Sequence, residues 1–447
     1  MRKLLCIVFA VVALAACQKQ EPAQPQFSSE AISQVTAEMT DLMVNDVTNP
    51  PLAARFFAYA CLAGYEVVAQ NDSAYQSMHS ALNQFPVIEK PAVSNYSYQL
   101  SALLAMMETA KKMQPSGTLM ETYEQHFLDS CRTSGMDAEL VNNSLRYAQS
   151  ISKQVLAYAK ADKYNQISNY PRYTPKEGDG NWYPTPPGYF PPVEPYFNTI
   201  RSFTLDSCSQ FKPVPPVAFS TNKSSEFYRL MQQVYEEGKN MPEEHHQIAA
   251  FWDCNPFALQ DKGHLMVGMK KISPGAHWMG ITGIACKQAN KSFAAAMQIN
   301  TTVAVALMDG FICCWDEKFR SNRIRPETAI RKYMDPTWKP MLQTPPFPEY
   351  LSGHSTVSAA SAVVLTHFLG DNFHFTDTVE ERYGLKARQF TSFHQAAQEA
   401  AISRMYGGIH YKDAIDNGLE QGFRVGALVL QKVEKVPAVT NVAVAGK

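Results

Sequence analysis

The sequence predicts an all-α protein of two packed helical bundles joined by a long ordered loop. In residues 28–163 apolar side chains recur at three- and four-residue spacing, as helices with a buried face require. Residues 164–220 hold 11 of the 28 prolines, interleaved with aromatic residues. Helical patterns resume over residues 221–436, and residues 437–447 form a tail. We therefore expect helices on both sides of one irregular connector.

Residues 1–16 have the features of a bacterial lipoprotein signal peptide. Arg2 and Lys3 form a basic start, an apolar run follows, and Leu-Ala-Ala precedes Cys17. The alternative is a plain secretory signal. A stable transmembrane helix is not expected, because the apolar run is too short. We expect a lipid on Cys17 and a polar tether over residues 17–27. This arrangement predicts attachment to a lipid bilayer outside the cytoplasm, in the bacterial cell envelope.

The first bundle is expected to contain structural helices without a chemical motif. The expected helical stretches are residues 32–43, 52–69 after Pro50-Pro51, 96–113 and 138–161. Their methionine and leucine stripes are typical of a core. We expect no apolar run of membrane-spanning length after Cys17.

Residues 164–220 have too many prolines to form a helix or a central strand. The interleaved aromatic residues, as in W-Y-P-T-P-P-G-Y from Trp182 to Tyr189, argue against disorder. An exposed proline-rich ligand is the alternative, but such segments are less aromatic. We expect an ordered loop that packs across the helices and covers the site.

The second bundle is expected to present the chemistry at helix ends. The expected helices are residues 226–251, 290–314, 355–369, 395–404 and 410–434. Three short clusters lie at their ends. They are W-D-E-K-F-R-S-N-R-I-R-P (315–326), P-F-P-E-Y-L-S-G-H-S (346–355) and S-R-M-Y-G-G-I-H-Y-K-D (403–413).

The basic residues of these clusters suit a compact oxyanion. Lys318, Arg325 and Arg404 can oppose several negative oxygens, and a guanidinium group matches a tetrahedral oxyanion bidentately. Each basic residue alone could equally be part of a solvated helix face. Their occurrence together in one order favours a binding site.

The remaining cluster residues supply neutral donors and proton-transfer groups. Ser352 and the Gly353 amide precede a predicted helix, whose positive end attracts anions. His354 and His410 can divide two tasks, one bonding the central atom and the other moving protons.

These clusters resemble the signature shared by type-2 phosphatidic-acid phosphatases and vanadium-dependent haloperoxidases, K-x6-R-P, then P-S-G-H, then S-R-x5-H-x3-D. The matching residues are Lys318, Arg325 and Pro326, then Ser352, Gly353 and His354, then Ser403, Arg404 and His410. Leu351 replaces the usual proline, and Ala414 replaces the final aspartate. Asp413 is a nearby candidate for the outer shell, but the group that orients His410 is left open.

The resemblance implies the fold of the vanadium haloperoxidases and two possible activities. In a haloperoxidase, His410 would bond vanadium, while the basic residues with Ser352 and Gly353 would hold the vanadate oxygens. His354 would take a proton from hydrogen peroxide, Lys318 would polarise the peroxide, and halide would be oxidised to hypohalous acid. In a phosphatase, phosphate would occupy the same site, His410 would attack a phosphate ester and His354 would protonate the leaving group. An inactive oxyanion-binding lipoprotein is the third alternative.

Three further residues have roles implied by the same resemblance. Trp315 and Phe347 match aromatic positions of the halide pocket in chloroperoxidase-like members, and this match favours the haloperoxidase. The alternative is that both are core aromatics. Asp253 follows a Phe-Trp pair and is the candidate acid that steadies the arginines, with Asn255 the nearer match by spacing.

Composition excludes some functions. The formal net charge is −1, so the chain lacks the basic surplus typical of nucleic-acid partners. Of the nine cysteines, Cys6 leaves with the signal peptide and Cys17 is the lipid site, so seven remain in the body of the protein. No C-x-x-C or zinc-type spacing occurs, and His277 is expected to be structural. The sequence does not determine halide preference, organic substrate, disulfide pairing or oligomeric state.

Overall fold

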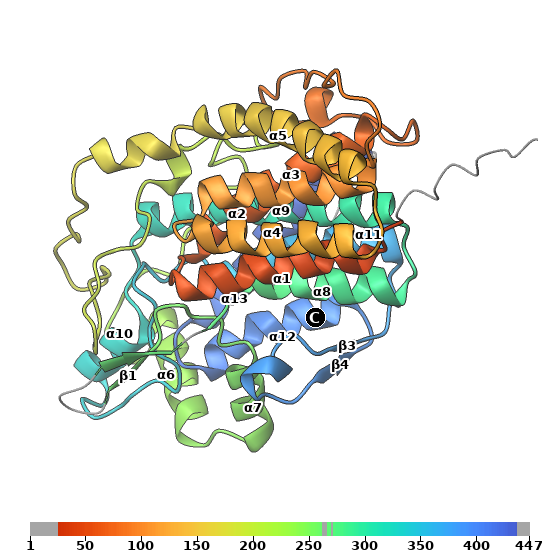
Figure 1. Cartoon of the computed structure of the whole chain (residues 1–447). Coiled ribbons are helices and arrows are strands. Elements are labelled where there is room, and N and C mark those ends of the chain that lie inside the picture. Colours follow the sequence, from red (N-terminus) through yellow and green to blue (C-terminus); the bar gives the residue numbers. More distant parts are fainter. Residues whose placement is uncertain (1–25, 262–265, 270, 436–447) are drawn as a thin grey trace, which may run out of the picture.

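The structure is a computed structural model that describes residues 26–261, 266–269 and 271–435. Its described part consists of α-helices, short 3-10 helices and two small β-hairpins (Figure 1). The all-α fold is therefore confirmed. The predicted signal peptide, Cys17, all but the last two residues of the tether, and the tail over 437–447 lie outside the described residues.

The first group of helices comprises α1 to α5. Their bounds are α1 Ser29–Asn45, α2 Pro50–Ala69, α3 Tyr98–Met113, α4 Gly117–Thr133 and α5 Ala138–Lys160, with the 3-10 helix η1 Met78–Ser80. The Asn49 side chain caps α2 by accepting from the Leu52 amide at 2.9 Å, and the two prolines occupy its first turn. The prolines thus begin α2 as well as ending the preceding segment.

The connector is ordered and carries two 3-10 helices, η2 Tyr164–Asn169 and η3 Phe197–Thr199. Its Trp182 is fully buried, and the Trp182 amide donates to the Asn322 carbonyl at 2.8 Å. At its start, buried Asp162 accepts from Arg55 Nε at 2.7 Å and from the Tyr59 hydroxyl at 2.9 Å. Removing one partner of such a buried pair typically costs about 3–5 kcal/mol.

The second group carries the site. Its helices are α6 Glu226–Lys239, α7 Glu243–Phe251, α8 Pro274–Gln288, α9 Phe293–Ser321, α10 Pro326–Tyr333, α11 Gly353–Leu369, α12 Phe393–Tyr406 and α13 Lys412–Val433, with η4 Glu381–Tyr383. Strands β1 Leu259–Asp261 and β2 Met266–Gly268 pair antiparallel, as do β3 Phe375–Asp377 and β4 Arg388–Phe390.

Several expected boundaries were wrong. The helix expected over residues 290–314 continues to Ser321, so Lys318 lies within α9 instead of beyond it. The helix expected over residues 226–251 is two helices, separated near Pro242. The last helix begins at Lys412, and His410 lies in the preceding turn. These differences arise because helix ends depend on capping and tertiary contacts as much as on apolar spacing.

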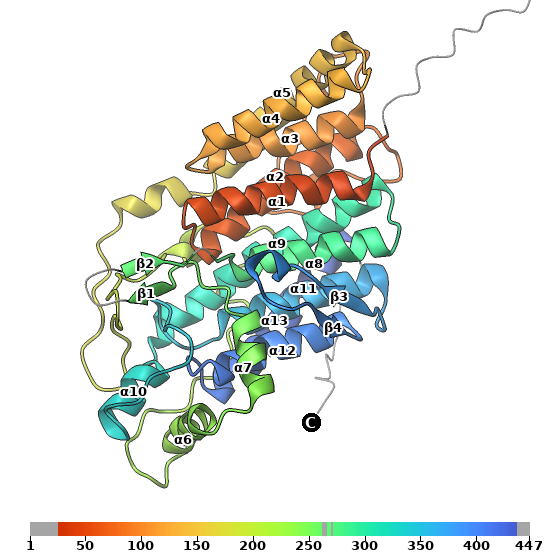
Figure 2. The ribbon, with the colours of Figure 1, turned by 60° about the horizontal axis from the view of Figure 1, so that its bottom comes forward.

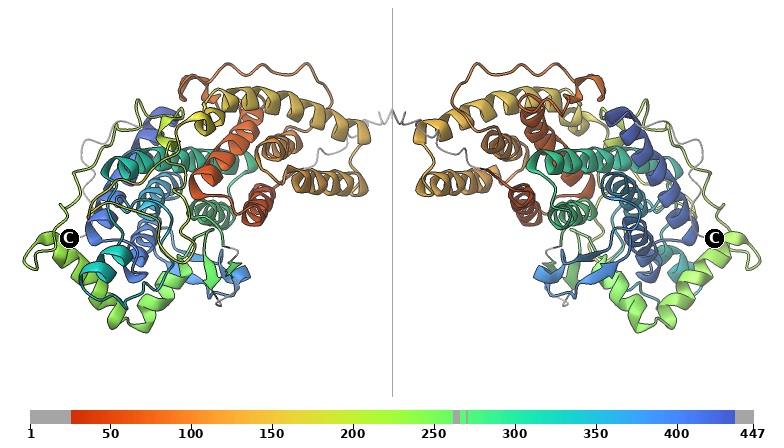
Figure 3. Two further views of the ribbon diagram at one scale, coloured as in Figure 1. Left: turned by 90° about the vertical axis from the view of Figure 1, so that its left-hand side faces the viewer. Right: turned by 90° about the vertical axis from the view of Figure 1, so that its right-hand side faces the viewer.

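Helices α2 and α9 join the two groups. In Figure 2, α1 to α5 lie over α8 and α9, with α11 to α13 beyond them, and Figure 3 shows the same order from the sides. The Thr301 hydroxyl of α9 donates to the Cys61 carbonyl of α2 at 3.1 Å, and both residues are fully buried. The two groups therefore share one continuous core.

Helices α11 and α13 pack closely because glycines face the contact. A Cβ added to Gly422 would lie 2.1 Å from the Thr356 carbonyl oxygen, and one added to Gly426 would lie 2.8 Å from that of Ala360. At Gly418, an added Cβ would approach the Ser355 side chain at 2.8 Å. This approach brings the start of α11 beside the turn that precedes α13.

We expected no apolar run of membrane-spanning length after Cys17. As far as length and composition are concerned, this expectation was wrong. Pro50–Ala69 and Phe293–Ser321 are long and apolar enough to cross a membrane. Their most apolar windows are 89% and 94% buried inside the protein. Both therefore have the burial of core helices.

The seven cysteines within the described residues are all free thiols. Six are buried and Cys208 is half-buried.

Candidate oxyanion site

Helix α9 and the start of α10 deliver the first two basic residues. Helix α9 ends at Ser321 and is capped by Asn322, which adopts the left-handed conformation with φ of 51°. Arg325 then precedes α10, with Pro326 in its first turn. Both Lys318 and Arg325 are fully buried.

Lys318 is held by backbone carbonyls. Its Nζ donates to the carbonyls of Pro348 at 3.0 Å and Glu349 at 3.1 Å, and also to that of Leu351. Burial, which disfavours the charged form, lowers the pKa of Lys318 to about 7. The ammonium group is therefore poised to gain from a nearby anion.

Arg325 and Arg404 have the same type of support. Arg325 Nε donates to the Phe347 carbonyl at 2.9 Å, and its Nη1 donates to the Ile409 carbonyl at 2.8 Å. Arg404 Nη1 donates to the Trp252 carbonyl at 2.7 Å. Arg325 Nη2 and Arg404 Nε are buried and have no hydrogen-bond partner among the described residues. The carbonyls thus orient both guanidinium groups and leave one donor of each available.

His410 is oriented by Glu349. Its Nδ1 lies 2.8 Å from Glu349 Oε1, which also accepts from the Tyr411 amide at 3.0 Å. The other ring nitrogen, Nε2, lies 3.1 Å from Arg325 Nη1. Burial, and then the charges of Arg325 and Lys318, hold the pKa of His410 well below its usual range. With a proton on Nδ1, the Nε2 lone pair is directed into the group of cations.

Asp413 does not contact His410. It binds Arg323 instead, with Arg323 Nη2 2.7 Å from Asp413 Oδ1. Arg323 Nε in turn donates to Glu349 Oε2 at 2.6 Å. Asp413, which lies one residue before the family's aspartate position, is therefore linked to His410 only through Arg323 and Glu349. Sequence reasoning missed Glu349, although it stands in the second cluster three residues before Ser352.

The second cluster forms the start of α11. The Ser352 side chain caps the helix by accepting from the Ser355 amide at 3.3 Å. Gly353 and His354 occupy the first turn. The amides of a first helical turn lack intrahelical partners and can bind an anion. Within the part of the chain that the structure describes, His354 Nε2 has no hydrogen-bond partner. Burial, followed by Arg404 and His410, lowers the pKa of His354 well below its usual range.

A small pocket of about 20 Å³ lies at this point and has room for about one or two water molecules. Residues of several elements line it: Pro50, Cys254, Asn255, Phe257, Pro274, Phe311, Trp315, Pro345, Phe347, Gly353, His354, Arg404 and His410. The rings of Trp315 and Phe347 are 4.9 Å apart. Both expected halide-pocket aromatics thus lie beside both histidines.

The connector supports this pocket from behind. Trp315 Nε1 donates to the Val193 carbonyl at 3.1 Å, and the Val193 amide donates to the Pro346 carbonyl at 3.0 Å. The described residues that line the pocket include none from the connector, whereas Pro50 of α2 does line it. The connector was expected to cover the site, but it instead supports one wall of the pocket from behind.

Asp253 lies near Arg404 and favours its positive charge, although burial lowers the pKa of Arg404 overall. The Asp253 carboxylate is paired with Lys271. Asn255, the alternative by spacing, lines the pocket, and its Nδ2 lies 3.4 Å from the Gln343 carbonyl.

These groups fit a tetrahedral oxyanion. Arg325 Nη2 and Arg404 Nε are unpaired buried donors, and His410 Nε2 faces the same cations. An unpaired buried donor costs about 1–3 kcal/mol, so an anion that satisfies these groups is favoured. The fold and site define an all-helical enzyme that binds an oxyanion beside a histidine.

Comparisons with known proteins identify the family. The family model described as the VCPO second helical-bundle domain matches residues 298–438. The crystal structure of a bacterial vanadium-dependent iodoperoxidase is 43% identical, covers 92% of this chain and 98% of its own, and has a TM-score of 0.86. The chain therefore belongs to the vanadium-dependent haloperoxidases, which are peroxidases and use vanadate.

Two more distant structures share the fold. The apo form of a bacterial vanadium-dependent chloroperoxidase is 15% identical, covers 87% of this chain and 95% of its own, and has a TM-score of 0.65. The holo form is 16% identical, covers 92% and 96%, and has a TM-score of 0.61. The comparison with curated proteins returned no match.

The role of Glu349 can be tested with Glu349→Gln. The amide removes a negative charge and cannot accept from His410, Tyr411 and Arg323 together, so His410 loses its orientation. We expect vanadate affinity, measured by titration calorimetry, to fall about 10- to 100-fold. Asp413→Asn is the matched control and should have a smaller effect, because Asp413 is linked to Glu349 only indirectly, through Arg323. Equal losses in two folded variants would contradict the assignment of Glu349 as the direct orienting group.

Proposed function

We propose that this protein oxidises iodide with hydrogen peroxide at vanadate bound by His410. The observation that carries the proposal is the 43% identity with a bacterial vanadium-dependent iodoperoxidase over almost the whole of both chains. Two further observations support it: His410, His354 and Arg404 line one pocket, and Arg325 contacts His410 Nε2.

In this proposal the protein's own residues hold the anion. His410 Nε2 would hold the vanadium, and Glu349 keeps the proton on Nδ1. Lys318, Arg325 and Arg404 would balance the charge of the oxygens, and Ser352 and the Gly353 amide would donate hydrogen bonds to them. Bound vanadate supplies a Lewis acid that activates peroxide for attack by halide.

His354 is the proton-transfer group in this proposal. Its unpaired Nε2 and lowered pKa mean that it is neutral and able to accept a proton from incoming peroxide. Lys318 lies 5.0 Å from the Phe347 ring centre and 5.6 Å from that of Trp315. A positive charge beside two aromatic rings suits a large halide, because iodide loses its hydration more readily than smaller halides.

Phosphate-ester hydrolysis through His410 uses the same groups and is an outcome of the same experiment. The mature chain, freed of phosphate, is assayed with iodide, bromide and chloride and with a phosphate ester, each with and without orthovanadate. We expect peroxide-dependent oxidation of iodide that requires vanadate and exceeds that of bromide and chloride. Hydrolysis that vanadate inhibits, without halide oxidation, would make the protein a phosphatase. Neither activity, despite tight oxyanion binding, would indicate an inactive binding protein.

The two histidines should give different losses. His410→Ala should abolish vanadate binding and turnover, because it removes the only proposed bond to vanadium. His354→Ala should leave vanadate binding unchanged but lower turnover by about 100-fold or more. His367→Ala, at an exposed position on the same helix as His354, is the control and should change neither. A folded His410→Ala variant with full turnover would refute the assignment, and loss of binding in His354→Ala would exchange the two roles.

We propose further that a lipid on Cys17 anchors the enzyme to the outer side of a bacterial membrane. The proposal rests on the Leu-Ala-Ala-Cys sequence that follows the apolar run. Cys17→Ser should move the protein from the membrane fraction to the soluble fraction of expressing bacteria. Continued detergent-requiring membrane association of this variant would contradict the anchor, and Cys208→Ser is a control that should leave fractionation unchanged.

A further inference from the structure

A second cluster of chemically active side chains lies beside the oxyanion site and takes no part in the mechanism above. It consists of Cys254, His277, Asp377 and Glu380, which are 2%, 0%, 0% and 7% exposed. Cys254 follows α7, His277 lies on α8, Asp377 ends β3, and Glu380 precedes η4. Four separate positions of the chain thus converge in one buried place.

The distances within the cluster are those of metal ligands. Cys254 Sγ lies 3.5 Å from His277 Nδ1, and His277 Nδ1 lies 3.3 Å from Glu380 Oε1. Cys254 Sγ lies 3.9 Å from Glu380 Oε1. Ligands bound tetrahedrally to zinc at bond lengths of about 2.0–2.3 Å are separated by about 3.3–3.6 Å. Two of the three separations agree with this range, and the third exceeds it by a few tenths of an ångström.

The other nitrogen of His277 has the partner expected behind a metal ligand. His277 Nε2 lies 2.8 Å from Asp377 Oδ2, and Asp377 Oδ1 accepts from the Val379 amide at 3.0 Å. A carboxylate bound to the far nitrogen of a ligating histidine fixes the tautomer and the ring orientation. Asp377 therefore directs the Nδ1 lone pair of His277 towards Cys254 and Glu380.

The charges of the cluster also call for a cation. Two buried carboxylates contact the two ring nitrogens of His277, and within the described part of the chain neither forms an ion pair with lysine or arginine. Burial of such charge is costly unless it is paired or bound to a metal. His277 alone cannot balance two carboxylates.

We propose that Cys254, His277 and Glu380 bind a zinc ion, with Asp377 as the orienting carboxylate. Binding replaces the thiol proton of Cys254 by a sulfur–zinc bond and releases that proton to solvent. A ligand set of sulfur, nitrogen and carboxylate oxygen suits zinc better than calcium or magnesium, which prefer oxygen ligands alone. This site is distinct from the vanadate site at His410.

The zinc ion would stabilise one wall of the oxyanion site. The Trp252 ring stacks on His277 at 4.5 Å between ring centres, and the Trp252 carbonyl accepts from Arg404 at 2.7 Å. Cys254, which lines the oxyanion pocket, is two residues further on. Zinc would therefore link the turn that binds Arg404 to α8 and to the segment that precedes η4. Coordination would also protect the Cys254 thiol from oxidants formed in the pocket.

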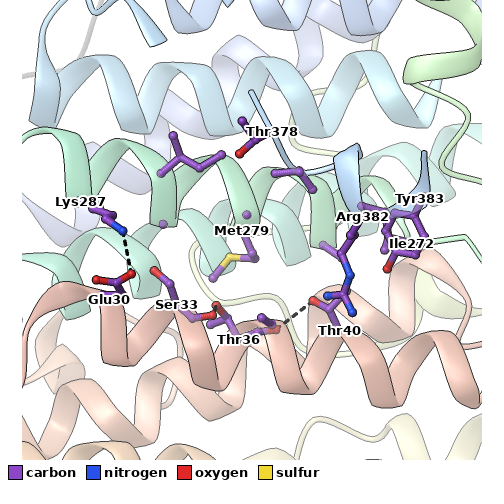
Figure 4. Close-up of a pocket in the computed structure, with 16 residues that line it drawn as sticks. Glu30, Ser33, Thr36, Thr40, Ile272, Met279, Lys287, Thr378, Arg382 and Tyr383 are labelled. Atoms are coloured by element: carbon purple, nitrogen blue, oxygen red, sulfur yellow. Dashed lines mark hydrogen bonds and ion pairs between the residues drawn. The ribbon is translucent and has the colours of Figure 1, made fainter. Parts of the chain in front are cut away.

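A groove of about 310 Å³ lies near the cluster, although none of the four cluster residues lines it (Figure 4). It lies between α1, α8 and the segment around η4. Ala276 and Gly280 of α8 line it, as do Val379 and Arg382 on either side of Glu380. The residues that flank two proposed ligands thus face this groove.

The test is a titration of the chelator-stripped mature protein with cobalt(II), a spectroscopic substitute for zinc. We expect one cobalt per chain, a thiolate-to-cobalt charge-transfer band, and loss of that band when zinc is added. Cys254→Ser should lose the band. Cys286→Ser is the control: it removes a different buried thiol, which lies on α8, and should retain the band. Asp377→Asn should keep the band but weaken metal affinity about 10- to 100-fold.

Stripped wild-type protein that remains folded by circular dichroism but gives no thiolate band would overturn the proposal. Retention of the same band in Cys254→Ser would also overturn it. If Cys254→Ser does not fold, the wild-type band and the weakened Asp377→Asn decide the question. None of these measurements requires halide oxidation, so their result is independent of the proposed iodide activity.

Discussion

The burial of three cations around one neutral histidine is the constraint on which the rest of the site depends. Lys318, Arg325 and Arg404 are at most 1% exposed, and their partners within the protein are mainly backbone carbonyls. Carbonyls orient a cation but do not neutralise its charge. The pocket is therefore left with positive charge that a bound oxyanion can balance, and this requirement explains why the cations are held so firmly in place.

The segment from Phe347 to Leu351 is the main support of these cations. Its carbonyls bind Lys318 and Arg325, and its one buried carboxylate, Glu349, binds His410 and Arg323. A single short segment thus sets the positions of two cations and of the histidine. Close packing of α11 on α13, which the glycines of α13 permit, then places the helix start at Ser352 beside His410.

The far wall of the pocket depends on the turn that contains Trp252 and Cys254. This turn supplies the carbonyl that orients Arg404, and it rests on His277. A metal ion at Cys254, His277 and Glu380 would give this wall a rigidity that a short turn lacks. On one side of the pocket, backbone carbonyls position Lys318 and Arg325. On the other side, a cluster of side chains supports the turn that binds Arg404.

The sequence by itself determined the helical class, the ordered connector and the chemistry of the three clusters, because helical spacing, proline density and short motifs are local properties. The cluster motifs by themselves identify Lys318, Arg325, His354, Arg404 and His410 as site residues. Which carboxylate orients His410 could not be named, since Asp413 and Glu349 are equally acidic in the sequence.

Only the tertiary structure decided that Glu349 reaches the imidazole and that Asp413 binds Arg323. It also decided that Cys254 and His277 meet carboxylates more than one hundred positions along the chain from Cys254. Contacts over such separations depend on how helices pack, and packing is set by the shape of the whole core, which no local pattern contains.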